Sequence, residues 1–330
     1  MRALKGLLAL LVLLAAAAGA WLYVFSHRAY APPQLPYEFT VRPGAGLKAV
    51  SRQLGAEGLF PEGESLWILA RVLGRAPTVQ AGTYRLEAAV TPLELLDKLA
   101  RGDVVLAEVR FIEGTTFRQW QGVLFAQPRL RATLGGKSPQ EVAKLLGLEH
   151  DSPEGWLFPD TYRYAPGISD LDLLKLAHAR MKRRLDEGWK ARALDLPLKT
   201  PYEALILASI VEKETGAPEE RPRVAAVFYN RLRRGMRLQT DPTVIYGMGE
   251  RYDGNIRKRD LTTDTPWNTY TRDGLPPTPI AMPGAASLAA VFAPAQSEDL
   301  YFVGKGDGTH QFSRTLEDHN RAVVKYQLKR

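Results

Sequence analysis

The longest uninterrupted apolar run in the chain is Gly6–Phe25, close to its beginning. A run of this length matches the hydrocarbon thickness of a bilayer, so it predicts a transmembrane helix. Trp21 and Tyr23 are residues of the kind that anchor such a helix at the membrane–water interface. Arg2 and Lys5 precede the run, and this charge weakly favours an amino terminus on the cytoplasmic side.

Small residues at positions 15–20 leave a cleaved signal peptide as the alternative to a retained anchor. The run is long for a signal peptide, so we expect residues 1–28 to form a cytoplasmic amino terminus and a single-pass anchor. Residues 29–36 contain the sequence APPQLP, which predicts a proline-rich spacer. In either case the rest of the chain would work outside the cytoplasmic membrane.

Shorter amphipathic segments follow, and the first group predicts a small α+β module at residues 37–103. Its expected order is strand, helix, helix, strand and a further helix, at 37–41, 47–55, 65–73, 81–86 and 91–102. The last helix has Pro92 at its first position and Gly102 after its end, which are typical start and stop residues. The order resembles a LysM-like glycan-binding module. A spacer domain is the equally weighted alternative.

The remaining residues, 104–330, predict a second and larger α+β domain. Alternating positions favour strands at 104–112, 300–303 and 309–312, and helical periodicity favours helices at 117–125, 139–146, 171–185, 201–215, 221–234 and from 316 onward. Residues 239–247 read as a loop that enters a buried segment, and residues 262–284 as a long, turn-rich loop. The expected fold class is therefore α+β, with a transmembrane helix, a small LysM-like module and a larger catalytic domain.

The helix at 201–215 differs from the others because it is apolar nearly all round and then ends in charge. Thr200 and Glu203 predict a capping box at its start. A helix that is apolar on all sides is usually buried. We therefore expect its final acidic residues, Glu212 and Glu214, to face a defined site within the protein. A surface Glu-Lys-Glu cluster at a frayed helix end is the alternative.

The two acids are not equivalent, because residues three and four apart share a helix face. Glu214 lies over Ile210 and Val211, whereas Glu212 lies over smaller and more polar residues. Apolar contact and the negative end of the helix dipole both raise a carboxyl pKa. We therefore predict that Glu214 is a general acid and that Glu212 has a structural role, such as pairing with an arginine.

Polar and aromatic residues in three loops are candidates for lining a cleft. In the first, Glu154 and Trp156 begin the rigid, irregular sequence EGWLFPDTY, and an aromatic ring there could stack on a sugar. The others are polar candidates for binding a substrate: Gln239, Thr240, Asp241, Asn268 and Tyr270. A packed corner and ordinary loop polarity are the alternatives.

The amino-acid composition limits the kinds of catalytic and binding site that the chain can form. The 330 residues contain no cysteine, which excludes disulfides and thiolate sites, and the five histidines show no metal-ligand spacing, so we expect no metal and no cofactor. The net charge of +8 includes an arginine cluster at 231, 233, 234 and 237, which is either a solvated face or an attraction for an anionic polymer. An exported chain rarely meets nucleic acid, so we expect no nucleic-acid partner.

The motifs EGWLFPDTY, ASIVEKET, RLQTDPTVIYG, NTY, GLPP and HQF occur in this order. Together they resemble the YceG-like (MltG) family of endolytic murein transglycosylases, and the likeness extends over essentially the whole chain. In that family the second acid of the Glu-Lys-Glu triplet is catalytic, and it falls on Glu214 here. The helix-face argument selects the same residue.

The resemblance implies cleavage of the bond between N-acetylmuramic acid and N-acetylglucosamine within nascent glycan strands, leaving 1,6-anhydromuramoyl ends. It also implies a place in the cell inner membrane with the catalytic domain on the periplasmic side, beside peptidoglycan synthases. Two alternatives stay open. One is a glycan hydrolase that uses water and a second acid such as Asp241, and the other is a non-catalytic wall-binding scaffold.

Overall fold

The computed structural model describes all residues except 1, 62, 76–78 and 329–330. The chain divides into two compact units, Met1–Ala107 with Arg163–Gly167, and Glu108–Tyr162 with Ile168–Arg330. Helices dominate, and the described strands pair in two-stranded sheets, β1–β2, β3–β4 and β5–β6. The predicted α+β class with an amino-terminal apolar helix is confirmed.

The amino-terminal helix α1 (Arg2–His27) carries an apolar stretch, Leu4–His27, with a mean hydropathy of 2.4. By length and composition this stretch can cross a membrane, and it fits a single-pass anchor. Its last turn is different, because Phe25 is buried among residues of the module that follows.

The module of the first unit has the predicted order of elements. These are β1 (Tyr37–Val41), α2 (Leu47–Ala56), α3 (Ser65–Val72), β2 (Gly82–Leu86) and α4 (Pro92–Arg101). The strands are antiparallel, with Tyr37 opposite Leu86 and Val41 opposite Gly82. Alternate residues of β1 face a core that α2, α3 and α4 complete. The α4 capping box at Thr91 and the left-handed Gly102 after its end are both present.

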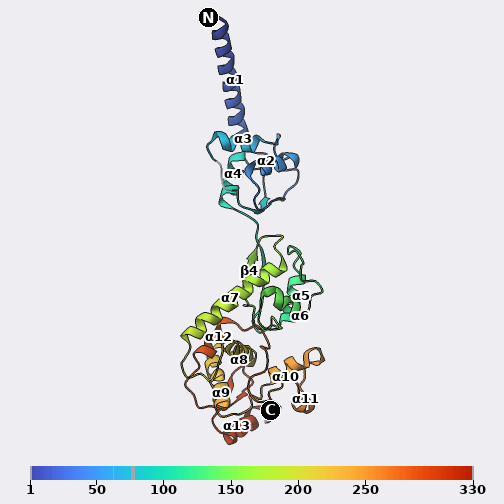
Figure 1. Ribbon diagram of the computed structural model, residues 1–330, viewed down its shortest axis with the longest axis vertical. Helices are drawn as coiled ribbons and strands as arrows, with labels where there is room; N and C mark the ends of the chain where they lie inside the picture. The colour runs from blue at the N-terminus through green and yellow to red at the C-terminus, as the bar shows by residue number, and fades with distance from the viewer. Residues whose placement is uncertain (1, 62, 76–78, 329–330) are drawn as a thin grey trace. The chain divides into compact units, whose positions relative to one another are not determined.

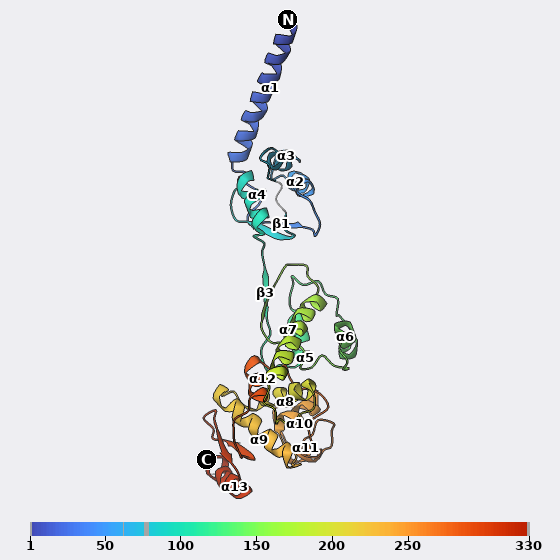
Figure 2. The same cartoon turned by 60° about the vertical axis from the view of Figure 1, so that its left-hand side comes forward.

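The elements from residue 107 onward hold the larger core. They are β3 (Ala107–Arg110), α5 (Phe117–Phe125), α6 (Pro139–Leu146), β4 (Thr161–Tyr164), α7 (Asp170–Ala191), α8 (Pro201–Glu214), α9 (Arg221–Arg233), α10 (Asp241–Met248), α11 (Lys258–Thr262), α12 (Ala285–Phe292), β5 (Tyr301–Gly304), β6 (His310–Ser313) and α13 (Leu316–Val323). Helix α8 packs against α7, α9, α10 and α12, which surround it in Figures 1 and 2. Every residue from Ala204 to Val211 is buried, as its apolar pattern predicts.

Three local predictions were only partly right. Residues 241–248 form α10 rather than a loop, because Pro242 starts a helix well and Thr243 and Val244 find a core to enter. At the start of α8, Thr200 caps Glu203 as expected, but the Glu203 carboxylate accepts from the Lys199 N–H, so the capping box is incomplete. The strand expected at 104–112 spans only Ala107–Arg110.

Candidate active site

Glu214 is the last residue of α8, and Thr215 leaves the helix in extended conformation. The Glu214 side chain is partly exposed, and it opens onto a cleft of about 430 Å³ within the second unit. Besides Glu214 itself, residues from five places line this cleft: the end of α9, residues 238–241 at the start of α10, the loop at 270, β5 with β6, and the carboxy-terminal helical segment from α13 onward. The helix therefore carries its terminal acid out of the core and into a hollow, as the sequence predicted.

Within the described part of the chain, the Glu214 carboxyl group has one hydrogen-bond partner, the Thr240 hydroxyl, which donates to its Oε1. Thr240 is buried, and its own N–H donates to Thr269 Oγ1 at 3.0 Å. The Gln239 N–H donates to the Thr269 carbonyl at 3.1 Å. The loop around residue 269 thus holds the segment 239–240 against the end of α8.

The environment raises the pKa of Glu214 to about 7. Burial is the main cause, because it disfavours the charged form, and the nearby Asp241 carboxylate adds to it. The Thr240 hydrogen bond and the positive charges of His310 and Arg231 oppose the rise. A carboxyl group that titrates near neutral pH can both give and accept a proton, which a general acid and base requires.

Glu212 has a different environment two residues earlier. Its side chain is 5% exposed, Arg221 lies 3.4 Å from its Oε1, and the Gly284 N–H donates to its Oε2 at 2.9 Å. These contacts tie the end of α8 to the start of α9 and to the segment before α12. The predicted arginine partner is present, and these contacts are consistent with the predicted structural role.

Gln239, Asp241 and Tyr270 lie at the Glu214 cleft together, as the sequence predicted. The Tyr270 hydroxyl donates to Asp241 Oδ1 at 2.6 Å, which fixes both side chains. Gln239 has a left-handed backbone with φ of 47°, alone in this respect among the described non-glycine residues. Such strain clusters at binding sites, and here it turns an exposed amide toward the cleft.

Asn268 is placed differently from its neighbour Tyr270. It is 1% exposed, and its Nδ2 donates to three carbonyls, those of Asp260, Leu261 and Thr263. Its Oδ1 accepts from the Tyr270 N–H at 2.8 Å. Its amide is therefore engaged with the backbone of the loop and holds Tyr270 in place.

Glu154 and Trp156 lie outside the residues that line the Glu214 cleft. Glu154 is 4% exposed beside a separate cavity of about 720 Å³, where it accepts from the Phe117 N–H and from the Tyr246 hydroxyl. Burial raises its pKa to about 8. Trp156 stacks on Tyr202, and its ring packs against the core around α8. These contacts show that both residues pack against other side chains of the second unit.

Two cationic residues of the cleft were not predicted. Arg231 is buried, and its guanidinium donates to the carbonyls of Leu300 and Leu238. His310 begins β6, with its Nδ1 2.7 Å from Glu220 Oε2. Arg231 continues the apolar stripe of α9 at Val224, Val227 and Phe228, and that spacing was the available signal.

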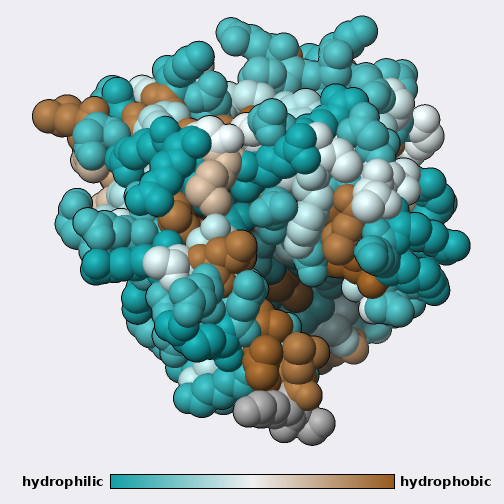
Figure 3. Space-filling view, turned by 90° about the horizontal axis from the view of Figure 1, so that it is seen from below, coloured by the Kyte–Doolittle hydropathy of each residue, from teal (hydrophilic) through white to brown (hydrophobic). Residues whose placement is uncertain are grey.

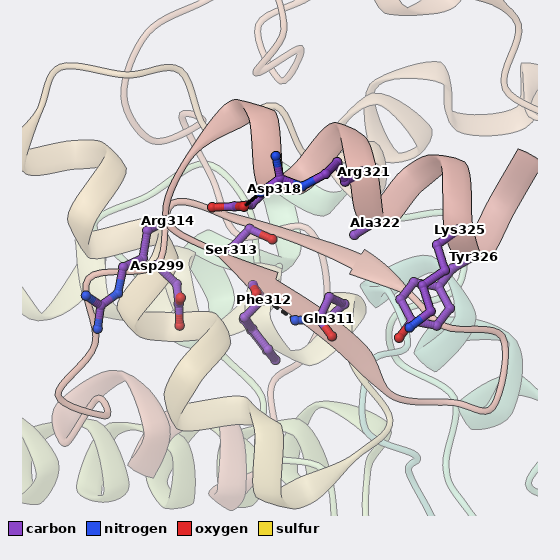
Figure 4. Close-up of a pocket in the computed structure, with 10 residues that line it drawn as sticks. All are labelled: Asp299, Gln311, Phe312, Ser313, Arg314, Asp318, Arg321, Ala322, Lys325 and Tyr326. Carbon is purple, nitrogen blue, oxygen red and sulfur yellow. Dashed lines mark hydrogen bonds and ion pairs between the residues drawn. The ribbon is translucent and has the colours of Figure 1, made fainter.

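A further hollow of about 460 Å³ lies between β6 and the carboxy-terminal helices (Figure 4). Several of its charged residues form ion pairs, since Arg321 contacts Glu317 and Asp318, and Asp299 contacts Arg223. Seen from below, the molecular surface is mostly hydrophilic, and hydrophobic residues gather around one hollow (Figure 3). No group of three potential metal ligands occurs in the part of the chain that the structure describes.

The sequence profile of the YceG-like family matches residues 39–325, which include Glu214 and every element around it. The chain belongs to the YceG-like family. A crystal structure of a YceG-like protein from Listeria monocytogenes matches 86% of this chain and 98% of that one, with a TM-score of 0.58 and 28% identity. The fold described above is therefore the YceG-like fold.

Relatives of this YceG-like chain include two proteins named endolytic murein transglycosylase. The one from Bacillus subtilis is 38% identical over 173 residues, which are 52% of this chain and 48% of that protein. The one from Streptococcus pneumoniae D39 is 28% identical over 317 residues, which are 86% of this chain and 57% of that protein. The chain thus spans about half the length of the curated relatives it matches.

Proposed function

We propose that this YceG-like chain is an endolytic lytic transglycosylase of peptidoglycan. It would cleave the β-1,4 bond between N-acetylmuramic acid and N-acetylglucosamine inside a glycan strand and leave a 1,6-anhydromuramoyl end. The observation that carries the proposal is Glu214, a carboxyl group with a pKa raised to about 7 at the edge of a cleft. The names of the relatives support the same activity.

One carboxyl group suffices for this reaction. The protonated Glu214 gives its proton to the glycosidic oxygen as the bond to the sugar breaks, and an oxocarbenium-like centre forms. The resulting carboxylate then takes the proton of the sugar's own 6-hydroxyl, which attacks that centre and closes the anhydro ring. Because the nucleophile is tethered, its effective concentration is high and no bound water is needed.

The other cleft residues would assist both the protonated and the ionised form of Glu214. The Thr240 hydroxyl and the charges of Arg231 and His310 stabilise the carboxylate that exists between the two proton transfers. Gln239 presents an exposed amide that suits an N-acetyl group of the sugar. Asp241, oriented by Tyr270, supplies negative charge that suits an oxocarbenium-like centre. Asn268 acts through Tyr270 as a positioning residue.

A hydrolase is the second candidate, and the observation that favours it is Asp241. This carboxylate lies in the same cleft as Glu214 and could activate water. The products separate the two mechanisms, because hydrolysis leaves reducing ends and transglycosylation leaves anhydro ends. A non-catalytic scaffold would give no product at all.

The test is digestion of nascent, un-crosslinked glycan by the full chain, with the masses of the products measured. We expect anhydro ends from the wild type and no cleavage by Glu214→Gln, which still binds glycan. Glu219→Gln is the matched control, because Glu219 is an exposed acid just after α8, and it should cut normally. Unchanged cutting by Glu214→Gln would contradict the assignment.

We further propose the organisation that serves this activity. Residues 1–28 would anchor the chain in the cell inner membrane by a single span, and residues 29–36 would be a proline-rich spacer after this anchor. Residues 37–103 would form a LysM-like module. Residues 104–330 would form the catalytic domain, which cleaves glycan on the periplasmic side. An enzyme placed there meets strands as peptidoglycan synthases release them, so cleavage would end strand elongation. Crosslinking in cells to a synthase, lost when the anchor is exchanged, would test this placement.

A further inference from the structure

Helix α3 of the first unit has an apolar outer face. Leu66 and Leu69 point into the core of the module, as expected for an amphipathic helix. The opposite side carries Ile68 and Val72, which are one turn apart and 38% and 65% exposed, and Leu73 just after the helix is 46% exposed. Among the described residues of the module, none covers this face, so it fits an external apolar partner.

Cations and an aromatic ring border the same face. Trp67 is partly exposed, Lys48 Nζ lies 4.6 Å from its ring centroid, and the Arg71 guanidinium lies 5.5 Å from it. A tryptophan with flanking lysine and arginine is the arrangement that suits the boundary between lipid headgroups and acyl chains. Lys48 also lies 3.4 Å from Glu64 Oε2, so Arg71 supplies the positive charge on this face that favours an anionic surface.

The connection between α1 and the module brings this face near the membrane. Phe25 in the last turn of α1 lies 5.6 Å from Tyr30 and 5.6 Å from Phe60, measured between ring centroids. Tyr30 in turn pairs with Val90 through two backbone hydrogen bonds of 2.9 and 3.0 Å. The apolar helix therefore runs directly into the module core, without a free linker between them.

Both views of the first unit show α3 at the end of the module that α1 enters, whereas the chain leaves the module at the opposite end (Figures 1 and 2). A bilayer crossed by Leu4–His27 must end close to Phe25, because that residue is already inside the module. The headgroup layer therefore passes beside α3.

We propose that the outer face of α3, formed by Trp67, Ile68, Arg71, Val72 and Leu73, docks in the headgroup region of the membrane that α1 crosses, with anionic phospholipid as its partner. The docking fixes the orientation of the module on the bilayer. The proposal rests on the membrane anchoring in the proposed function and on none of its chemistry.

The absence of cysteine makes the test direct, because a single introduced thiol can be labelled without background. The full chain carrying Val72→Cys is reconstituted into vesicles of phosphatidylethanolamine and phosphatidylglycerol and labelled from outside with an environment-sensitive fluorophore. We expect blue-shifted emission and quenching by nitroxide lipids, since such a face lies about 5–10 Å into the headgroup boundary. Ile68→Cys should respond in the same way.

Leu106→Cys is the matched control. Leu106 is also an exposed aliphatic residue, at 51%, but it lies where the chain leaves the first unit. Its label should report water and stay unquenched. Equal, water-like signals from V72C, I68C and L106C would overturn the docking, and equal shifts with and without phosphatidylglycerol would overturn the anionic partner. No glycan cleavage is measured, so an inactive enzyme and an undocked module give different results.

Discussion

Replacing Glu214 by glutamine should make the second unit more stable at pH 8. The folded protein raises the pKa of Glu214 from its ordinary 4.5 to about 7, so folding favours the protonated form. The unfolded chain binds fewer protons than the folded one between these values, and stability is therefore lost as the pH rises through this window. Glutamine keeps an acceptor for Thr240 but never ionises, so the variant avoids this loss.

The magnitude follows from the difference between the two pKa values. At about 1.4 kcal/mol per pH unit, the penalty above pH 7 reaches about 3 kcal/mol and disappears below pH 4. Urea unfolding at pH 4 and pH 8, followed by tryptophan fluorescence, measures it. Four of the six tryptophans, at 120, 156, 189 and 267, lie in the second unit and report on it.

Glu212→Gln is the internal control, because it should have the opposite effect. This substitution breaks the ion pair with the nearly buried Arg221, so the variant should be less stable than the wild type at pH 8. A Glu214→Gln protein with the same urea midpoint as the wild type at pH 8, or a lower one, would refute the reasoning that Glu214 is held protonated.

Other predictions follow from the same cleft. The kcat/KM of the wild type should fall as the pH rises through about 7, where Glu214 loses its proton, and a flat profile to pH 9 would contradict this role. Thr240→Val removes the hydroxyl that donates to the Glu214 carboxylate, so the pH at which kcat/KM falls should rise by about one unit. Thr240→Ser keeps the hydroxyl and should leave that pH unchanged. Gln239→Gly should relieve the left-handed strain and raise the free energy of unfolding by up to about 1 kcal/mol while it raises KM, and a lower urea midpoint would exclude strain. Asn268→Ala should cost about 2–3 kcal/mol of stability, and an unchanged midpoint would show that its bonds are dispensable.

The helix at the centre of the site was predictable because its signals are local. The cap at Thr200 directly precedes α8, the apolar body and the terminal acids lie within it, and the different surroundings expected for Glu212 and Glu214 follow from helical geometry. The elements of the small module were also predicted in the right order, since its strands and helices carry clear periodicity.

The rest of the site depends on contacts that sequence spacing does not reveal. Thr240 donates to Glu214, and Thr269, 29 residues later, accepts from the Thr240 backbone N–H and helps to position it. In the sequence Arg231 belongs to a basic cluster that could be a solvated face, but in the structure it is buried and donates to the carbonyl of Leu300, the residue just before β5. Trp156 was predicted to stack on a sugar, but it lies outside the Glu214 cleft and stacks on Tyr202. In each case a partner from another element decides the role.

The central claim is that the nucleophile is the sugar's own hydroxyl and not water. The most direct test is digestion of un-crosslinked glycan in heavy-oxygen water, with the new muramoyl ends weighed by mass spectrometry. The account predicts anhydro ends that carry no heavy oxygen and lack the mass of one water, and that are absent from the Glu214→Gln reaction. Ends that carry one solvent oxygen would contradict it and assign the chain to the hydrolases.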